Sequence, residues 1–111
     1  MGKKGTINKN DPNALKEAGN KAFSLSQFDE ALELYTKAIE IDPNNHIFFA
    51  NRANAYLETS NFDSCIEDCQ SAIKLNENFG KAYYRKAKAQ SFKGLIKESL
   101  KTLEEGIQRD Q

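Results

Sequence analysis

The feature that most constrains the fold of this chain is an internal repeat of 34 residues. From Pro12 onward the sequence divides into three units in register, at residues 12–45, 46–79 and 80–111. Apolar residues coincide between the units: Phe28 with Phe62 and Ile96, Leu32 with Ile66 and Leu100, and Ile39 with Ile73 and Ile107. A repeat of this length indicates stacked supersecondary units, because one unit cannot cover its own apolar face.

Each unit contains two stretches with the apolar spacing of an α-helix, separated by a short polar break. We therefore expect six helices, at residues 13–26, 28–42, 46–60, 62–77, 80–93 and 96–110. Small residues also fall in register, where two helices have to approach closely: Gly19, Ala53 and Ala87, and Ala38, Ala72 and Gly106. The sequence predicts an all-α fold of three stacked helical hairpins at residues 12–111, preceded by a flexible tail at residues 1–11.

The composition limits the classes of function. The chain carries 16 Lys and Arg against 16 Asp and Glu, so we expect neither a general nucleic-acid footprint nor nucleic-acid partners. It has no apolar run of membrane-spanning length and no signal-peptide core, which favours a cytoplasmic protein without membrane partners. It also lacks a phosphate-binding glycine loop and a nucleophile beside a base, so we predict no enzymatic activity and no cofactor.

The cysteines and the histidine give no metal or redox motif. Cys65 and Cys69 are four residues apart, one helical turn, a spacing that suits neither a disulfide nor a zinc site. We predict that both are small buried apolar residues. His46, the only histidine, stands at a helix start, and we expect it to be solvated rather than a metal ligand.

Charge is sorted between the helices. The first helices of the three units carry net charges of +1, 0 and +5, and the second helices carry −4, −3 and −1. If the first helices line the concave side of the stack, as the resemblance described below implies, the groove is basic and the back is acidic. The alternative is that these charges are only solvated and that the basic helices complement the acidic ones.

Five hydrogen-bond donors fall on the groove side of the first helices. They are Lys16 and Asn20, one turn apart; Asn51 in the second unit; and Lys81 and Arg85, again one turn apart. Lysine, arginine and asparagine donate to carboxylates, and arginine can bind one carboxylate through two parallel hydrogen bonds. We therefore expect this set to hold carboxylates, and we expect Lys81 and Arg85 to be solvated.

These residues carry a resemblance to a known family. A 34-residue helical hairpin with small residues at its eighth and twentieth positions, and Pro43 near its end, resembles the tetratricopeptide repeat. The resemblance implies a right-handed superhelical α-solenoid with a concave peptide groove. The segments KEAGNKAF, NRANAY and GKAYYRKA are similar to the carboxylate-clamp domains of co-chaperones, most of all the first repeat domain of the Hop/Sti-type stress-inducible organising co-chaperone.

That resemblance implies a partner and a role for each site residue. The partner would be the extreme C-terminus, ending EEVD, of heat-shock chaperones of the seventy- or ninety-kilodalton class. Lys16, Asn20, Asn51 and Lys81 would grip the two carboxylates of the final aspartate, and Arg85 would hold the peptide further along. An apolar wall for the valine that precedes the aspartate would be formed by Phe23, Asn54 and Leu57. Lys88 would contact a glutamate of the peptide. Packing between helices is the alternative for Phe23 and Leu57, and free solvation the alternative for Lys88.

Other readings remain open at this point. The uncovered last hairpin, with Leu100, Leu103 and Ile107, suggests either a fragment of a longer protein or self-association. The chain would then be a repeat scaffold, or the targeting domain of a larger phosphatase or prolyl isomerase. The carboxylate-clamp hypothesis predicts a monomer.

Overall fold

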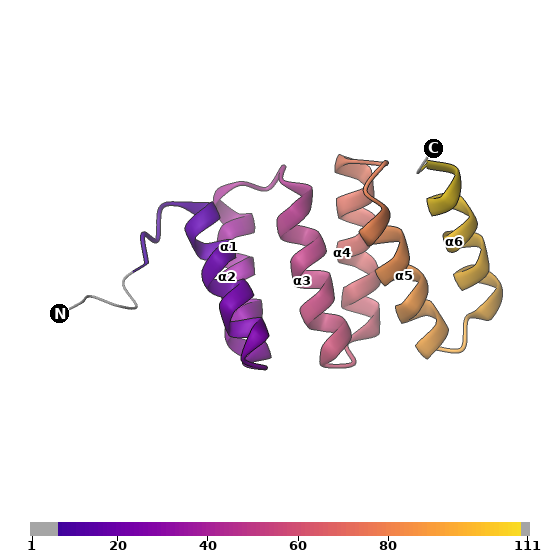
Figure 1. Cartoon of the computed structure of the whole chain (residues 1–111), viewed down its shortest axis with the longest axis horizontal. Helices are drawn as coiled ribbons and strands as arrows, with labels where there is room; N and C mark the ends of the chain where they lie inside the picture. Colours follow the sequence, from indigo (N-terminus) through magenta and orange to yellow (C-terminus); the bar gives the residue numbers. More distant parts are fainter. Residues whose placement is uncertain (1–6, 110–111) are drawn as a thin grey trace.

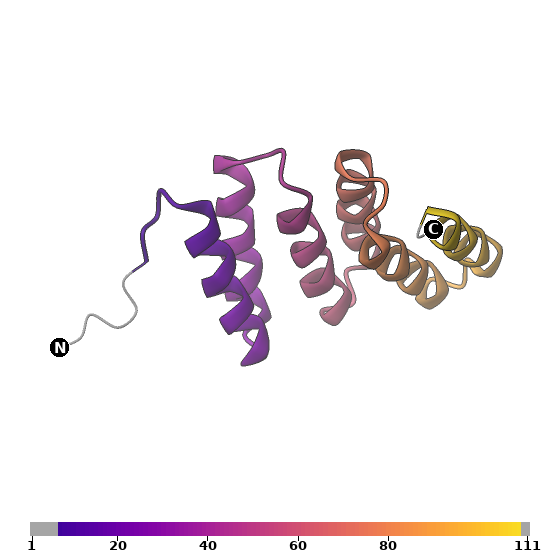
Figure 2. The ribbon, with the colours of Figure 1, turned by 45° about the horizontal axis from the view of Figure 1, so that its top comes forward.

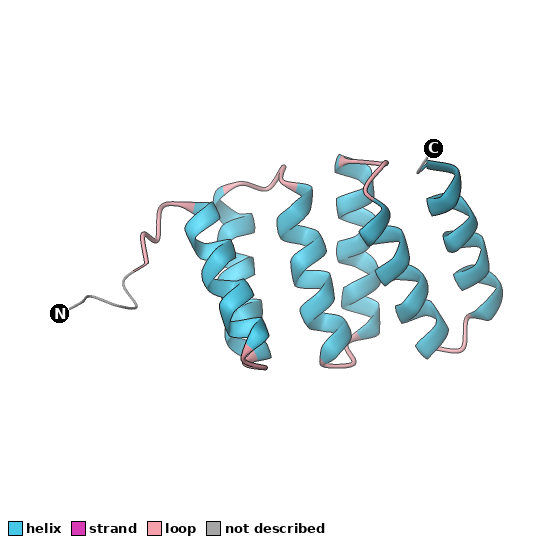
Figure 3. Ribbon diagram, viewed as in Figure 1, coloured by secondary structure: helices cyan, strands magenta, loops and turns pink. Residues whose placement is uncertain are grey.

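The computed structural model describes residues 7–109, which form six α-helices and no strand (Figure 3). The helices are α1 (Pro12–Ser24), α2 (Phe28–Ile41), α3 (His46–Glu58), α4 (Phe62–Leu75), α5 (Gly80–Phe92) and α6 (Ile96–Arg109). The predicted all-α fold of three hairpins is confirmed, and the first helices of the hairpins begin at the first residues of the three repeat units. Within residues 7–109 no helix is both long and apolar enough to cross a membrane.

The turn inside each hairpin repeats the same backbone geometry. Ser26, Ser60 and Gly94 occupy equivalent positions and have φ angles of 61°, 63° and 82°. A left-handed residue ends the first helix and reverses the chain, which places Phe28, Phe62 and Ile96 at the start of the second helix. The two serines adopt a conformation that glycine adopts without steric penalty.

The helix starts follow local chemistry. The Oδ1 atoms of Asp11 and Asn45 accept hydrogen bonds from the backbone N–H groups of Asn13 and Ile47, at 3.0 and 2.9 Å, and so cap α1 and α3. Asp29 and Asp63 lie in the first turns of α2 and α4. Carboxylates there are stabilised by the positive end of the helix dipole.

Small residues set the spacing within a hairpin. A methyl group at Gly19 would lie 2.5 Å from the ring of Tyr35, and one at Gly106 would lie 2.8 Å from the Cβ of Tyr83. In each pair a bulky side chain of one helix fills the space that glycine leaves on the other. The close helix approaches predicted from the register are therefore confirmed at both glycines.

The hairpins stack into an elongated array of 53 × 25 × 20 Å (Figure 1). α1 contacts α3, and α3 contacts α5, whereas the backbones of α2, α4 and α6 do not approach one another within residues 7–109. The first helices therefore lie closer together than the second helices, and they form one face, which we call the inner face. In Figures 1 and 2, α2 and α4 lie behind this face.

The core runs along the array between the helix pairs. Its largest fully buried side chains are those of Leu15, Tyr35, Phe48, Cys65 and Cys69. The prediction that both cysteines are buried is confirmed, and both are free thiols with 0% exposure.

Two expectations need correction. His46 is half-buried rather than solvated, because its ring packs edge-on against Phe79 with 4.7 Å between the centroids. Ile7, expected in the flexible tail, is half-buried against the core that contains Leu15 and Ala22, whereas Asn8, Lys9 and Asn10 are exposed. The rest of that tail, residues 1–6, lies outside the described residues.

Candidate carboxylate-binding site

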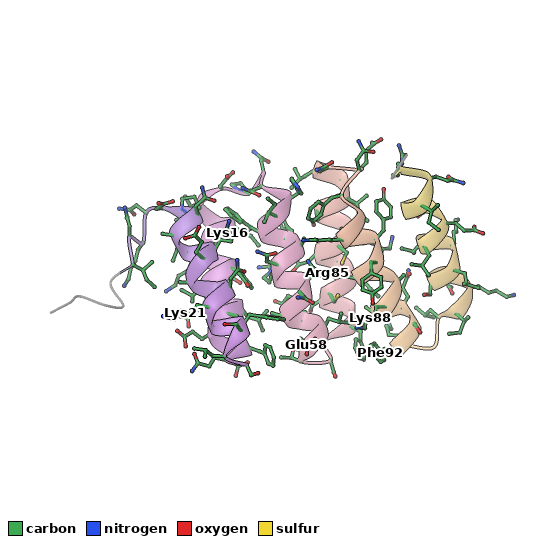
Figure 4. All side chains as sticks on the ribbon, viewed as in Figure 1. Lys16, Lys21, Glu58, Arg85, Lys88 and Phe92 are labelled. Carbon is green, nitrogen blue, oxygen red and sulfur yellow. The ribbon has the colours of Figure 1, made fainter. Side chains whose placement is uncertain are left out.

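The inner face brings donors from the three hairpins together. Asn51 Nδ2 donates to Asn20 Oδ1 at 3.3 Å, which joins α1 to α3. Arg85 Nη1 donates to the backbone oxygen of Ala50, the neighbour of Asn51, at 2.9 Å, which joins α3 to α5. Figure 4 shows Arg85 extending from α5 toward α3, on the face that also carries Lys16. The predicted convergence of α1, α3 and α5 is thus observed for Asn20, Asn51 and Arg85.

A tyrosine from α2 orients this cluster. Tyr35 Oη donates to Asn20 Oδ1 at 2.5 Å, so that oxygen accepts from both Tyr35 and Asn51. The Asn20 side-chain oxygen is therefore fully engaged by the protein, and the NH₂ group is the part left to donate to a ligand. Asn20 is exposed, so this donor faces solvent.

The protonation state of Tyr35 suits this role. Burial raises the pKa of Tyr35 to about 12, against a smaller opposing effect of the Arg85 charge. The hydroxyl therefore keeps its proton throughout the neutral range. The nearby Arg85 cation also favours a hydroxyl whose hydrogen points away from it, toward Asn20.

Arg85 is held by the protein, contrary to the sequence expectation that it is solvated. Its side chain is half-buried, and burial lowers the pKa of Arg85, although arginine stays charged at such sites. The expectation failed because the side chain lies across the cluster to Ala50 instead of extending into water. A cation fixed before a ligand arrives loses little conformational entropy on binding.

The lysines contribute charge that the protein does not neutralise. Within residues 7–109, Lys16, Lys81 and Lys88 form no ion pair. Lys81 is exposed, as predicted, and Lys16 is half-buried one turn before Asn20. Lys88 Nζ lies 5.8 Å from the centroid of the Tyr84 ring, so it makes a cation–π contact on α5.

The predicted apolar wall belongs mainly to the core. Leu57 is 8% exposed and packs with Ala53 and the two cysteines, which agrees with the packing alternative and leaves little of its surface for a ligand. Phe23 is half-buried, with its ring edge-on to Phe28 at 5.2 Å. Asn54 is half-buried on α3.

Arg52 is a cation of α3 that does not serve the inner face. Its Nε and Nη2 atoms donate to the two carboxylate oxygens of Asp68 at 2.7 and 2.8 Å, and its Nη1 donates to Thr36 Oγ1 at 3.1 Å. The hydrogen bond to Asp68 raises the pKa of Arg52. The ion pair ties α3 to α4, and the hydrogen bond to Thr36 ties α3 to α2, so the Arg52 charge is neutralised within the protein.

Sequence reasoning missed Tyr35 and the Arg52–Asp68 pair. A signal for Tyr35 was present, since Gly19 removes a side chain where a large ring has to fit. No group of three or more potential metal ligands occurs within residues 7–109.

Comparison with known families identifies the repeat. Families described as "TPR repeat" and "Tetratricopeptide repeat" match residues 19–60, 47–79 and 80–111. The chain belongs to the tetratricopeptide repeat family. A curated relative, the small glutamine-rich tetratricopeptide repeat-containing protein 2 of Mycosarcoma maydis, is 40% identical over 96 residues, or 86% of this chain. The chain spans 27% of the length of that relative.

Solved structures of tetratricopeptide repeat domains superpose closely. The first such domain of Spaghetti (RPAP3), bound to the HSP90 peptide SRMEEVD, gives a TM-score of 0.87 at 34% identity, covering 94% of this chain and 82% of that one. The TPR2B domain of yeast Sti1, in complex with an Hsp70 peptide, gives 0.87 at 31% identity, covering 89% and 79%. The predicted resemblance to co-chaperone repeat domains is confirmed by these matches.

Proposed function

We propose that this tetratricopeptide repeat chain is a non-catalytic co-chaperone module that binds the free, acidic C-terminus of heat-shock chaperones, ending EEVD, in the cytoplasm. The observation that carries the proposal is the linked cluster of Asn20, Asn51 and Arg85 on the inner face. The two repeat domains described above, each bound to a chaperone-derived peptide, support the assignment of the ligand.

The donors of the inner face indicate how the ligand is recognised. A C-terminal aspartate carries a side-chain and a main-chain carboxylate, and the inner face offers several donors to them. Lys16, Lys81 and the Asn20 and Asn51 amides grip these two groups, and Arg85 holds the peptide further along. The free main-chain carboxylate occurs only at a chain end, so it gives specificity for the terminus in a small contact area.

The expected affinity is moderate. A short peptide with a handful of charged contacts should bind at about 1 μM, or about −8 kcal/mol, after the loss of its translational and conformational freedom. The prearranged Arg85 and Asn20 reduce the part of this loss that arises on the protein side.

Calorimetric titration with SRMEEVD as free acid and as C-terminal amide tests the proposal. Removing the main-chain charge should weaken binding by about tenfold or more, because charge-assisted hydrogen bonds contribute about 1.5–3 kcal/mol each. Lys81→Ala should weaken binding of the free acid, whereas Lys37→Ala, which removes the same charge from a half-buried lysine of α2 that pairs with Glu33, should not. Equal affinities for acid and amide would rule the clamp out.

A further inference from the structure

An acidic side chain lies on the otherwise basic inner face. Glu58 follows Asn51 by seven residues, so it lies within about 20° of Asn51 around α3 and about 10 Å further along the helix axis. Glu58 is exposed, and within residues 7–109 it forms no ion pair. Figure 4 shows it at the end of α3, near Lys88 and Phe92 of α5. The donor cluster and an uncompensated carboxylate therefore share one face.

The fold gains nothing from a carboxylate at this position. Glu58 is the last residue of α3, where the negative end of the helix dipole disfavours an anion. No lysine or arginine stands three or four residues before or after it, whereas Glu17, the other acid of the first helices, precedes Lys21 by four residues. The equivalent residues of the first and third hairpins are the uncharged Ser24 and Phe92. The charge of Glu58 therefore indicates a role in binding rather than in folding.

The repeat register gives the order of charges along the inner face. α3 and α5 contact each other and run in the same direction (Figure 1), so residues 34 positions apart lie at the same level of the two helices. The matched pairs are Asn51 with Arg85, Asn54 with Lys88, and Glu58 with Phe92. From the starts of α3 and α5 toward their ends, a ligand meets hydrogen-bond donors at the first two levels. One turn beyond Lys88 it meets the carboxylate of Glu58.

This spacing suits a peptide in which a cation precedes the acidic end. In SRMEEVD the arginine stands five residues before the final aspartate. An extended chain advances about 3.3 Å per residue, so the arginine lies up to about 17 Å from that aspartate. Glu58 lies about 10 Å beyond Asn51 along α3, and the remaining distance is within the combined length of an arginine and a glutamate side chain. A peptide anchored at the donor cluster can therefore bring its cation to Glu58.

We propose that Glu58 makes the inner face selective for acidic C-termini that carry a lysine or arginine about five residues before the final aspartate. The inference rests on the proposed binding of such C-termini at Asn20, Asn51 and Arg85, and it adds a second point of recognition. The cation pairs with Glu58 in contact with solvent, so the pair discriminates between acidic tails and supplies little of the total affinity. A tail with an acid at the same place is repelled by Glu58.

A double-mutant cycle between the chain and its peptide tests the proposal. The second peptide is SQMEEVD, in which glutamine replaces the arginine of SRMEEVD. Calorimetry at low salt should show that the native chain binds SRMEEVD about twofold to fivefold more tightly than SQMEEVD, the range expected of an exposed ion pair. A uniformly basic groove would instead prefer SQMEEVD, which is more negative by one charge. Glu58→Gln should abolish the preference for SRMEEVD, and Glu58→Lys should reverse it.

The matched control is Glu67→Gln, which removes the same charge from an exposed residue of α4, behind the inner face (Figure 1). This variant should keep the preference for SRMEEVD. Glu58→Gln should not lower the thermal unfolding temperature, because the carboxylate opposes the helix dipole. Equal affinities of the native chain for the two peptides, or a preference that survives in Glu58→Gln, would overturn the inference and leave the carboxylate site standing. If neither peptide bound, the proposed function and the inference would both be wrong.

Discussion

At the scale of single residues, the orientation of one amide decides what the inner face can bind. Asn20 Oδ1 accepts from Tyr35 and Asn51, so its NH₂ group is directed outward by partners from two other helices. An asparagine without such partners presents either its oxygen or its NH₂ group to a ligand. Tyr35 is therefore a positioning residue for the proposed carboxylate site: it does not touch the ligand but determines that Asn20 donates.

Replacement of Tyr35 by phenylalanine tests this role. Tyr35→Phe keeps the ring beside Gly19 and removes only the hydroxyl, so Asn20 loses one of the two bonds that orient it. We expect SRMEEVD affinity to fall about threefold to tenfold, as for a lost hydrogen bond of about 1 kcal/mol. The ratio of affinities for the free acid and the amide should shrink as well, which a purely structural role would not cause.

The matched control is Tyr83→Phe. Tyr83 Oη donates to the backbone oxygen of Glu77 at 2.8 Å, so this variant also removes a part-buried tyrosine hydroxyl bond, here to the loop between α4 and α5. It lies outside the Asn20 cluster and should leave peptide affinity unchanged. If both variants bound the peptide as the native chain does, the assignment of Tyr35 as a positioning residue would be wrong.

At the scale of helices, packing within a hairpin depends on which atoms face a glycine. The neighbour of Gly106 is the Cβ of Tyr83, which cannot move without its backbone, whereas no atom lies within 4 Å of a methyl group placed at Gly80. Both glycines belong to helices of the last hairpin. The two positions therefore separate the intrinsic preference for alanine in a helix from the packing contact.

Gly106→Ala should destabilise the chain, whereas Gly80→Ala should not. The first forces α5 and α6 apart, and such overpacking costs about 1–3 kcal/mol, which exceeds the gain of about 1 kcal/mol in helix propensity. The second meets open space and should be neutral or slightly stabilising. Urea unfolding followed by circular dichroism measures both. Equal midpoints for the two variants would show that the hairpins yield easily at this contact.

The sequence reveals the features that depend on helix periodicity, but not those that depend on how the helices pack. Helix positions, and the placement of Lys16 and Asn20 on one face of α1, follow from periodicity alone. The solvation of Arg85 was predicted incorrectly, since charged side chains are usually exposed and only the path across α3 buries this one. Tyr35 was missed because it lies 15 residues from Asn20 on another helix, and their contact depends on how deeply the two helices pack. The peptide contacts assigned to Lys16, Asn20, Asn51, Lys81 and Arg85 stay predictions.

At the scale of the whole molecule, two surfaces of different chemistry lie on one array. The net charge of zero conceals an inner face with uncompensated lysines and a terminal helix with an apolar stripe. In a stack where each hairpin contacts only its neighbours, such surfaces are formed by different elements. Peptide binding uses α1, α3 and α5, whereas the exposed apolar residues Ile96, Leu100, Leu103 and Ile107 lie on α6.

Ionic strength should therefore control binding at the inner face. Between about 50 and 500 mM salt the Debye length falls from about 14 to 4 Å, so attraction between the inner face and an acidic peptide is strongly screened. We expect SRMEEVD affinity to fall by about tenfold or more over this range. Folding rests chiefly on apolar burial, which such salt does not weaken, so the thermal unfolding of the chain should change little over the same range. Calorimetry in a series of buffers measures the peptide affinity. A salt-independent peptide affinity would contradict the carboxylate site.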